Sequence, residues 1–255
     1  MKKVIASVMF ALTASTLMVS GNAVASGAAV HLEPAKVDLE NKASLQRGVK
    51  YYVNYCMGCH ALSYSRYNRV ANDLDLTEAQ VAKNLIFTRT DGEPTKVGEL
   101  MKNAMPAKDA SEWFGAPPPD LTLVARVRGA DWIYTYLKSF YADPSRPMGV
   151  NNTIFANVGM PHVLWELQGM QQKVCVKEGE GQHAVEHCHL EMVKPGKLSG
   201  TEYDQVAHDL TNFLAYVGEP IQDKRKVYGI FVLLFLGFFA LVAYALKKEY
   251  WKDVH

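Results

Sequence analysis

Five consecutive residues restrict the fold of this 255-residue chain more than any other feature: Cys56-Met57-Gly58-Cys59-His60. Two cysteines separated by two residues and followed at once by a histidine form the pattern to which c-type haem is attached. The two thiols add across the two vinyl groups of one porphyrin, so they must lie a short, constant distance apart. The histidine is carried beneath the ring, where its imidazole can bind iron. The sequence therefore predicts one covalently attached haem c at Cys56, Cys59 and His60.

Two other uses of a Cys-x-x-Cys pair are less well supported. A thioredoxin-like redox pair needs a strand–helix–strand context, which the surrounding sequence does not indicate. A structural zinc site needs a second ligand pair, and Cys175 and Cys188 have the wrong spacing for one. In an exported protein these two cysteines are expected to form a disulfide, which would close the polar loop between them and contribute roughly 3 kcal/mol. A metal site that combines Cys188 with His183, His187 and His189 is the alternative.

The N-terminus has the order of parts of a secretory signal peptide. Lys2 and Lys3 precede a mostly apolar stretch, residues 4–19, and a small-x-small cleavage pattern ends at Ala25. We expect residues 1–25 to be a cleaved signal peptide rather than an uncleaved membrane anchor.

A second apolar run, residues 227–246, has no charged residue. Its 20 residues, at about 1.5 Å each in a helix, match a hydrocarbon core about 30 Å thick. Basic and aromatic residues on both sides suit the two membrane interfaces. We expect a single transmembrane anchor in the inner (cytoplasmic) membrane, with residues 26–222 as a domain in the periplasm and residues 247–255 as a cytoplasmic tail.

The charge of the exported part excludes one class of partner. Residues 26–222 carry 19 Lys and Arg against 23 Asp and Glu, a net charge of −4. This balance does not indicate nucleic-acid binding. A mildly acidic electron-transfer domain could instead steer a basic soluble partner.

A haem iron in an electron carrier normally has two strong axial ligands, and His60 supplies one of them. The local sequence favours Met160 for the other, because Gly159 lets the backbone approach the ring and Pro161 rigidifies the loop. Met105, which also precedes a proline, and the nearby His162 stay open. The remaining methionines downstream of the motif are Met101, Met148, Met170 and Met192.

Helical periodicity predicts the frame around the motif. Residues 45–55 form a helix that leads into the cysteines, and residues 202–217 form a second helix with an apolar stripe, capped by Thr201 and Asp204. Asp120 is expected to cap a further helix, and residues 131–140 form another. Gly48 would allow the first helix to pack closely on a neighbour. Arg126 and Arg128, two residues apart, cannot share a helix face, so one could turn towards a haem propionate.

Taken together, these segments resemble the cytochrome c1 family, the haem subunit of the quinol–cytochrome c reductase complex (complex III), in its bacterial form. The resemblance covers nearly all of the mature chain and depends on an ordered set of motifs. These are Ser44-Leu45-Gln46-Arg47-Gly48 before the haem motif, Pro118-Pro119-Asp120-Leu121 with Arg126-Val127-Arg128-Gly129, Gly159-Met160-Pro161, Asp209 to Tyr216, Gly218-Glu219-Pro220 and the C-terminal anchor.

The resemblance implies a mainly α fold: a class I cytochrome c-like haem domain with insertions, plus one C-terminal transmembrane helix. It implies His60 and Met160 as axial ligands, Arg128 near a propionate, and Trp132 in contact with the haem. It further implies that electrons arrive from a Rieske iron–sulfur protein beside cytochrome b and leave to a soluble cytochrome c.

Two other functional classes remain at this stage. One is a free-standing, membrane-anchored cytochrome c that feeds a terminal oxidase or reductase. The other is a haem-based sensor, against which Met160 argues because a sensor needs an open or weak sixth position. The sequence contains no acid–base pair or nucleophile that would indicate an independent catalytic site.

Overall fold

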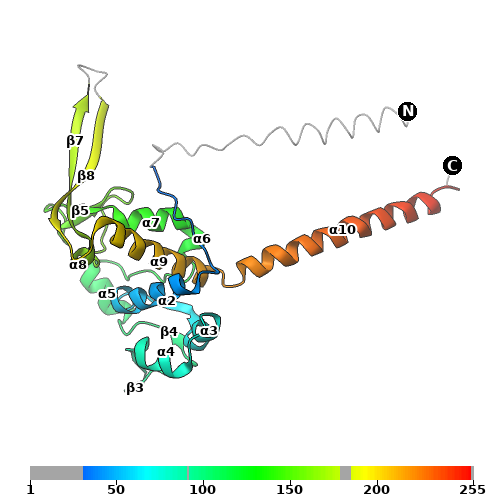
Figure 1. The fold of residues 1–255 in the computed structure, drawn as a ribbon, viewed down its shortest axis with the longest axis horizontal. Coiled ribbons are helices and arrows are strands. Elements are labelled where there is room, and N and C mark those ends of the chain that lie inside the picture. The colour runs from blue at the N-terminus through cyan, green and yellow to red at the C-terminus, as the bar shows by residue number, and fades with distance from the viewer. Residues whose placement is uncertain (1–30, 91, 179–184, 254–255) are drawn as a thin grey trace. The chain divides into compact units, whose positions relative to one another are not determined.

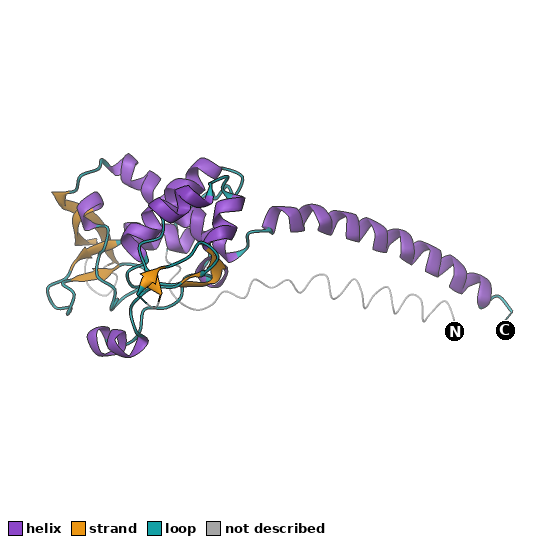
Figure 2. Cartoon of the chain, turned by 90° about the horizontal axis from the view of Figure 1, so that it is seen from below, coloured by secondary structure: helices purple, strands orange, loops and turns teal. Residues whose placement is uncertain are grey.

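The computed structural model describes residues 31–90, 92–178 and 185–253, so the predicted signal peptide lies outside the described residues. Helices dominate, as Figures 1 and 2 show, which confirms the mainly α prediction. The α-helices are α2 (Lys42–Tyr51), α3 (Tyr67–Asp73), α4 (Glu78–Asn84), α5 (Ala107–Phe114), α6 (Val124–Arg128), α7 (Ala130–Lys138), α8 (Trp165–Gln168), α9 (Gly200–Gly218) and α10 (Gln222–Tyr250). A π-helical turn, η1 (Tyr52–Cys56), extends α2.

The described strands form four antiparallel pairs. They are β1 (Leu62–Arg66) with β4 (Leu100–Met101), β2 (Arg89–Thr90) with β3 (Glu93–Pro94), β5 (Phe140–Ala142) with β6 (Val150–Asn152), and β7 (Gly169–Glu178) with β8 (Val185–Pro195).

The crossing of α2 and α9, which lie side by side in Figure 1, organises the core. A Cβ atom added to Gly48 would lie 2.2 Å from the Asp209 carbonyl oxygen and 2.6 Å from the Phe213 Cβ. The two backbones therefore approach more closely than any other residue at position 48 would permit. The predicted close approach at Gly48 is confirmed. Around it, α9 buries Val206, Leu210, Phe213, Leu214 and Val217, which confirms the apolar stripe predicted for this helix.

A buried carboxylate also joins the two helices. Asp209, whose side chain is 1 % exposed, accepts hydrogen bonds from Ser44 Oγ (2.7 Å), Gln205 Nε2 (2.9 Å) and both Nε (2.6 Å) and a terminal nitrogen (2.9 Å) of Arg47. Because every donor is close and the acceptor is ionised, the buried charge is well compensated. The network joins α9 to α2, the helix that η1 continues as far as Cys56.

Two predicted helix starts are wrong in detail. Ser199, not Thr201, caps α9: its side chain accepts from the Glu202 amide and the Glu202 side chain accepts from the Ser199 amide. Asp120 caps no helix, since α6 begins only at Val124. The Asp120 carboxylate instead accepts from the amides of Thr122 (2.8 Å) and Ser63 (2.7 Å), and so ties two loops together.

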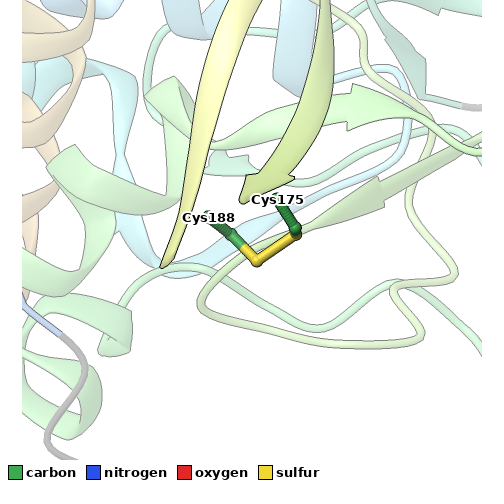
Figure 3. Close-up of a disulfide and its surroundings, with 2 residues drawn as sticks. All are labelled: Cys175 and Cys188. Carbon is green, nitrogen blue, oxygen red and sulfur yellow. A yellow bond between two sulfur atoms is a disulfide. The ribbon is translucent and has the colours of Figure 1, made fainter. Parts of the chain in front are cut away.

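Cys175 and Cys188, predicted to close a polar loop with a disulfide, lie on β7 and β8, two long strands that pair antiparallel. The disulfide is confirmed: the two cysteines face each other across the strands, as Figure 3 shows. Histidine 183 lies outside the described residues, while His189 Nε2 pairs with Glu191 Oε1 at 2.9 Å. In the part of the chain that the structure describes, no three His, Cys, Asp or Glu side chains are arranged to hold a metal ion.

Among the described residues, α10 is the one helix long and apolar enough to cross a membrane. It begins at Gln222 and ends at Tyr250, so it extends beyond the predicted span of residues 227–246 at both ends. None of its side chains is buried within the protein. An exposed apolar helix of this length is unfavourable in water, which fits a membrane anchor.

Candidate haem site

The position of His60 is set by a residue 59 positions away. Its Nδ1 lies 2.7 Å from the carbonyl oxygen of Pro119, and its side chain is largely buried. A carbonyl can only accept, so Nδ1 carries the proton and Nε2 presents the lone pair that can bind a metal. Burial lowers the pKa of His60, an effect that its bond to Pro119 partly opposes. The imidazole is therefore neutral, which is the form that binds iron.

The backbone around His60 is held from several sides. Tyr52 donates its hydroxyl proton to the His60 carbonyl at 2.7 Å, and the Asn103 side chain donates to the Cys59 carbonyl. Next along the chain, the Leu121 amide bonds to the Ala61 carbonyl at 3.0 Å. Burial alone would raise the pKa of Asp120, but its hydrogen bonds bring the pKa below its usual value, so the carboxylate stays charged. These contacts fix the histidine against the loop that carries Pro119.

The thiols of Cys56 and Cys59 are free in the structure and half-buried. Burial, with a further contribution from the neighbouring Cys59, raises the pKa of the Cys56 thiol to about 12. A redox or nucleophilic cysteine needs a lowered pKa, so this environment argues against the thioredoxin-like alternative. Two unpaired thiols directly before an oriented imidazole suit a haem c.

Met160 lies in a separate cluster. Its Sδ accepts a hydrogen bond from the Tyr136 hydroxyl at 3.4 Å, and it packs against Phe140, Val150 and Val158. Burial raises the pKa of Tyr136, so that hydroxyl remains a donor. The half-buried thioether is therefore held by α7 and by the β5–β6 pair.

Two buried asparagines shape the segment that leads to Met160. Asn152 accepts from the amides of Ile154 (3.0 Å) and Phe155 (3.3 Å), and Asn151 accepts from the amide of Asn157 (2.9 Å). Asn157 has φ of +61°, a left-handed conformation that asparagine tolerates better than most residues. The segment before Met160 is therefore irregular, and side-chain hydrogen bonds hold its backbone.

The other methionines have different environments. Met101 is fully buried opposite Leu62 in the β1–β4 pair, and Met192 is about half exposed on β8. Met148 and Met170 are partly buried beside the same cluster as Met160. Met105 is half-buried two residues after Asn103, whose side chain contacts the haem motif itself.

His162 is buried rather than at the surface. Its ring stacks on Phe140, with centroids 4.9 Å apart and planes 3° apart. Burial lowers its pKa to about 4, against weaker opposing contributions from Gly169 and Gln168. A neutral imidazole stacked in this way fits a packing role behind the Met160 segment.

Arg128 and Trp132 lie in contact on adjoining helices. The guanidinium carbon of Arg128 is 5.1 Å from the Trp132 ring centroid and 5.7 Å from that of Phe155. Trp132 also stacks on Tyr136 at 4.9 Å, and Tyr136 contacts Met160. Arg126 pairs instead with Glu219 at 2.8 Å, which agrees with the prediction that the two arginines do not share a helix face.

The predicted residues thus fall into two groups, Cys56–Cys59–His60 and Arg128–Trp132–Met160. Cys56, Trp132 and Tyr136 all pack against the same apolar core, which connects the groups. Sequence reasoning missed Pro119, Tyr136 and Phe155 as members of the site. Tyr136 could have been found, since it lies four residues after Trp132 on the same helix face.

These residues fit a haem c. The site offers two unpaired thiols, one imidazole nitrogen left free by the bond to Pro119, and a thioether held on another element. A Cβ atom at Gly159 would meet no protein atom within 4 Å, so packing within the chain does not require glycine beside Met160.

Comparison with known proteins shows the family to which the chain belongs. The model of the cytochrome C1 family matches residues 36–254. The chain is 51% identical to a cytochrome c1 of Allochromatium vinosum, over the whole length of both proteins. It is 46% identical to the ammonia monooxygenase gamma subunit of Nitrosomonas europaea, over 90% of this chain and 92% of that protein. It is 28% identical to cytochrome b/c1 of Bradyrhizobium diazoefficiens, over 84% of this chain and 34% of that protein.

The fold, the site and these matches define a haem protein of respiratory electron transport with an apolar C-terminal helix that fits membrane anchoring. The chain belongs to the cytochrome c1 family. The family implies a c-type haem and a place as an electron-transfer subunit of a reductase complex.

Proposed function

We propose that this chain binds one haem c through Cys56 and Cys59, with His60 and Met160 as axial ligands, and passes single electrons within a quinol–cytochrome c reductase. Its donor is a Rieske iron–sulfur protein and its acceptor a soluble cytochrome c. The bond from His60 Nδ1 to the Pro119 carbonyl carries this proposal most directly, because it leaves Nε2 as a neutral, oriented ligand.

Each residue has a separate task. When bound, haem c supplies one-electron chemistry between ferric and ferrous iron. His60 provides a strong ligand whose basicity is raised by its hydrogen bond to Pro119. Met160 provides a thioether, which favours ferrous iron relative to a second imidazole and excludes external ligands. The Tyr136 hydroxyl, bonded to the sulfur, orients it.

Met160 is preferred to Met105 as the second ligand because the two methionines lie in segments with different contacts to the haem motif. A second iron ligand would have to come from a segment other than the one that holds His60. The segment of Met105 contacts the Cys59 carbonyl through Asn103, so it belongs with the His60 side of the site. Met160 is held by α7 and β5, which lie outside the haem motif.

Arg128 and Trp132 are proposed to contact the haem. The Arg128 guanidinium lies over two aromatic faces, a geometry that fixes its plane while its N–H groups can still bind a propionate. Trp132 and Phe155, the two rings beneath it, would then form one wall of the haem pocket.

The proposed organisation follows from the two ends of the chain. Residues 1–25 direct export, residues 26–222 form the periplasmic haem domain, residues 227–246 span the inner membrane, and residues 247–255 remain in the cytoplasm. The exposed apolar helix α10 supports the anchor. Cytochrome b and the Rieske protein are the proposed partner subunits, and the chain has no independent catalytic site.

A purification with spectroscopy tests the assignment to a complex. The tagged protein is extracted gently in detergent from its native membrane, and a dithionite-reduced minus oxidised spectrum is recorded. A c-type band together with b-type bands and a copurifying iron–sulfur protein supports the proposal. A c-type band alone, with α10 intact, favours a free-standing carrier. Copurification with monooxygenase subunits would favour the role suggested by the name of the Nitrosomonas relative.

A further inference from the structure

Large apolar side chains are exposed around the point where the haem domain meets its anchor. Tyr64 is 77% exposed, Leu123 45%, Val127 78% and Ile221 52%. Together we name them the anchor-root patch. Exposed apolar residues that gather on one surface mark an interaction site more often than scattered ones do.

Contacts place these four residues at one end of the domain. The Tyr64 amide lies 3.4 Å from Thr122 Oγ1, directly before Leu123. A Cβ atom at Gly218 would touch both Thr122 and Arg126 at 3.4 Å, and α6 and α9 pack together there. Gly218 ends α9, three residues before Ile221 and four before the first residue of α10, and Figure 1 shows α6 beside this end of α9.

The exposed face of α6 is distinct from the face that serves the haem site. Leu121, Val124 and Ala125 pack against the core. Arg128, four residues after Val124, continues that side of the helix towards Trp132. Leu123 and Val127, also four residues apart, are exposed and form a stripe separate from that of Val124 and Arg128, the side on which Arg128 contacts Trp132.

We propose that the anchor-root patch lies in the headgroup layer of the membrane, so that α6 rests on the bilayer beside the point where α10 enters it. Ile221 precedes the charge-free span by six residues, about 9 Å of helix, which is comparable with the interfacial layer on each side of the hydrocarbon core. Tyrosine and aliphatic side chains at this depth are favourable because their apolar parts leave water.

The charges beside the patch suit an anionic bilayer surface. Arg126 and Arg225 both pair with Glu219, and Lys226 lies 3.2 Å from Asp223. With Lys224, the cations at this end outnumber the carboxylates. Basic side chains immediately outside a transmembrane helix attract anionic headgroups. A lipid surface is therefore the occupant that this patch fits, and the inference depends on the proposed anchoring by α10.

Photocrosslinking in native membranes tests the proposal with the full chain. p-Benzoylphenylalanine is introduced in place of Val127 and, separately, of Leu123. The matched control replaces Trp113, a 60% exposed apolar residue on α5, and the positive control replaces Phe235 within α10. A c-type absorption equal to that of the wild type shows that each variant has matured. Lipid adducts are read by intact mass and protein adducts by gel shift.

We expect lipid adducts at positions 127 and 123 in several-fold higher yield than at position 113. Lipid yields at positions 127 and 123 no higher than at position 113, together with strong lipid adducts at position 235, would show that the anchor-root patch does not contact lipid. The anchoring by α10 would not be affected by that result. A protein adduct at position 127 would overturn it in favour of a subunit interface. Failure of position 235 to crosslink lipid would overturn the anchoring and this inference together.

Discussion

Replacing Gly48 with alanine tests the geometry that delivers the haem motif. The added Cβ would lie 2.2 Å from the Asp209 carbonyl oxygen and 2.6 Å from the Phe213 Cβ. The first of these is a backbone atom of α9, so no side-chain rotation can relieve the clash, and the helices must separate by about 1 Å. A gap of that size forfeits a quarter to a half of the dispersion energy of the atoms along the interface.

The expected net cost follows from two opposing contributions. Overpacking costs about 1–3 kcal/mol and more where backbone atoms clash, whereas alanine gains about 1 kcal/mol of helix propensity over glycine. We expect a net loss of about 2–4 kcal/mol, which lowers Tm by roughly 4–15 °C for a domain of this size. The yield of covalently attached haem should fall as well, because α2 leads directly into Cys56.

Thermal melts of the purified holoprotein, followed by the haem absorption, measure this effect. Gly200→Ala is the matched control: Gly200 begins α9, and a Cβ there would meet nothing within 4 Å. Its Tm should equal or slightly exceed that of the wild type. A Gly48→Ala protein that melts with the Gly200→Ala protein would refute the close approach of α2 and α9.

Four further changes have defined outcomes. Met160→Leu should lower the reduction potential or let carbon monoxide bind the reduced protein, and an unchanged potential with continued exclusion of carbon monoxide would contradict the ligand assignment. Asp209→Ala should lower the free energy of unfolding, measured with denaturant, by about 3 kcal/mol, because the donors that now bond to the buried carboxylate would lose their acceptor. A loss under 1 kcal/mol would argue against the network. Because the folded pKa of Asp120 lies below its unfolded value of about 4, its ionised form stabilises the fold above about pH 4, and this contribution disappears as the pH falls through the folded pKa. In urea melts between pH 3 and 6, the free energy of unfolding should therefore fall less steeply with acid for Asp120→Asn than for the wild type. If the free energy of unfolding falls equally with pH in both proteins, Asp120 does not make this contribution. Replacing both Cys175 and Cys188 with alanine should speed hydrogen exchange in β7 and β8 while leaving the haem potential unchanged; a shifted potential would show that the hairpin reaches the haem site.

Sequence patterns predicted the features that depend on local spacing. The stripe of α9, the glycine at the crossing and the long apolar helix all follow from residues that lie near one another in the chain. The cap of α9 was misassigned because Ser199–Glu202 and Thr201–Asp204 have the same spacing. The structure shows that glutamate, whose longer side chain reaches back to the Ser199 amide, completes the box.

The features that were missed depend on distant contacts or on exposure. The hydrogen bond between His60 and Pro119 joins residues 59 positions apart, so the helical and strand periodicity of the sequence cannot predict it. The hairpin of β7 and β8 is exposed along most of its length, so it lacks the alternation of apolar and polar residues that marks a half-buried strand. Aspartate is a residue type that often caps helices, but the Asp120 carboxylate accepts a hydrogen bond from the amide of Ser63 in another loop.

The axial ligation is the central claim, and near-infrared magnetic circular dichroism of the oxidised protein tests it most directly. The account predicts the charge-transfer signal of histidine–methionine ligation in the wild type and its loss in Met160→Leu, with Met105→Leu unchanged. A bis-histidine signal in the wild type, or a signal that disappears with Met105 rather than with Met160, would contradict the account.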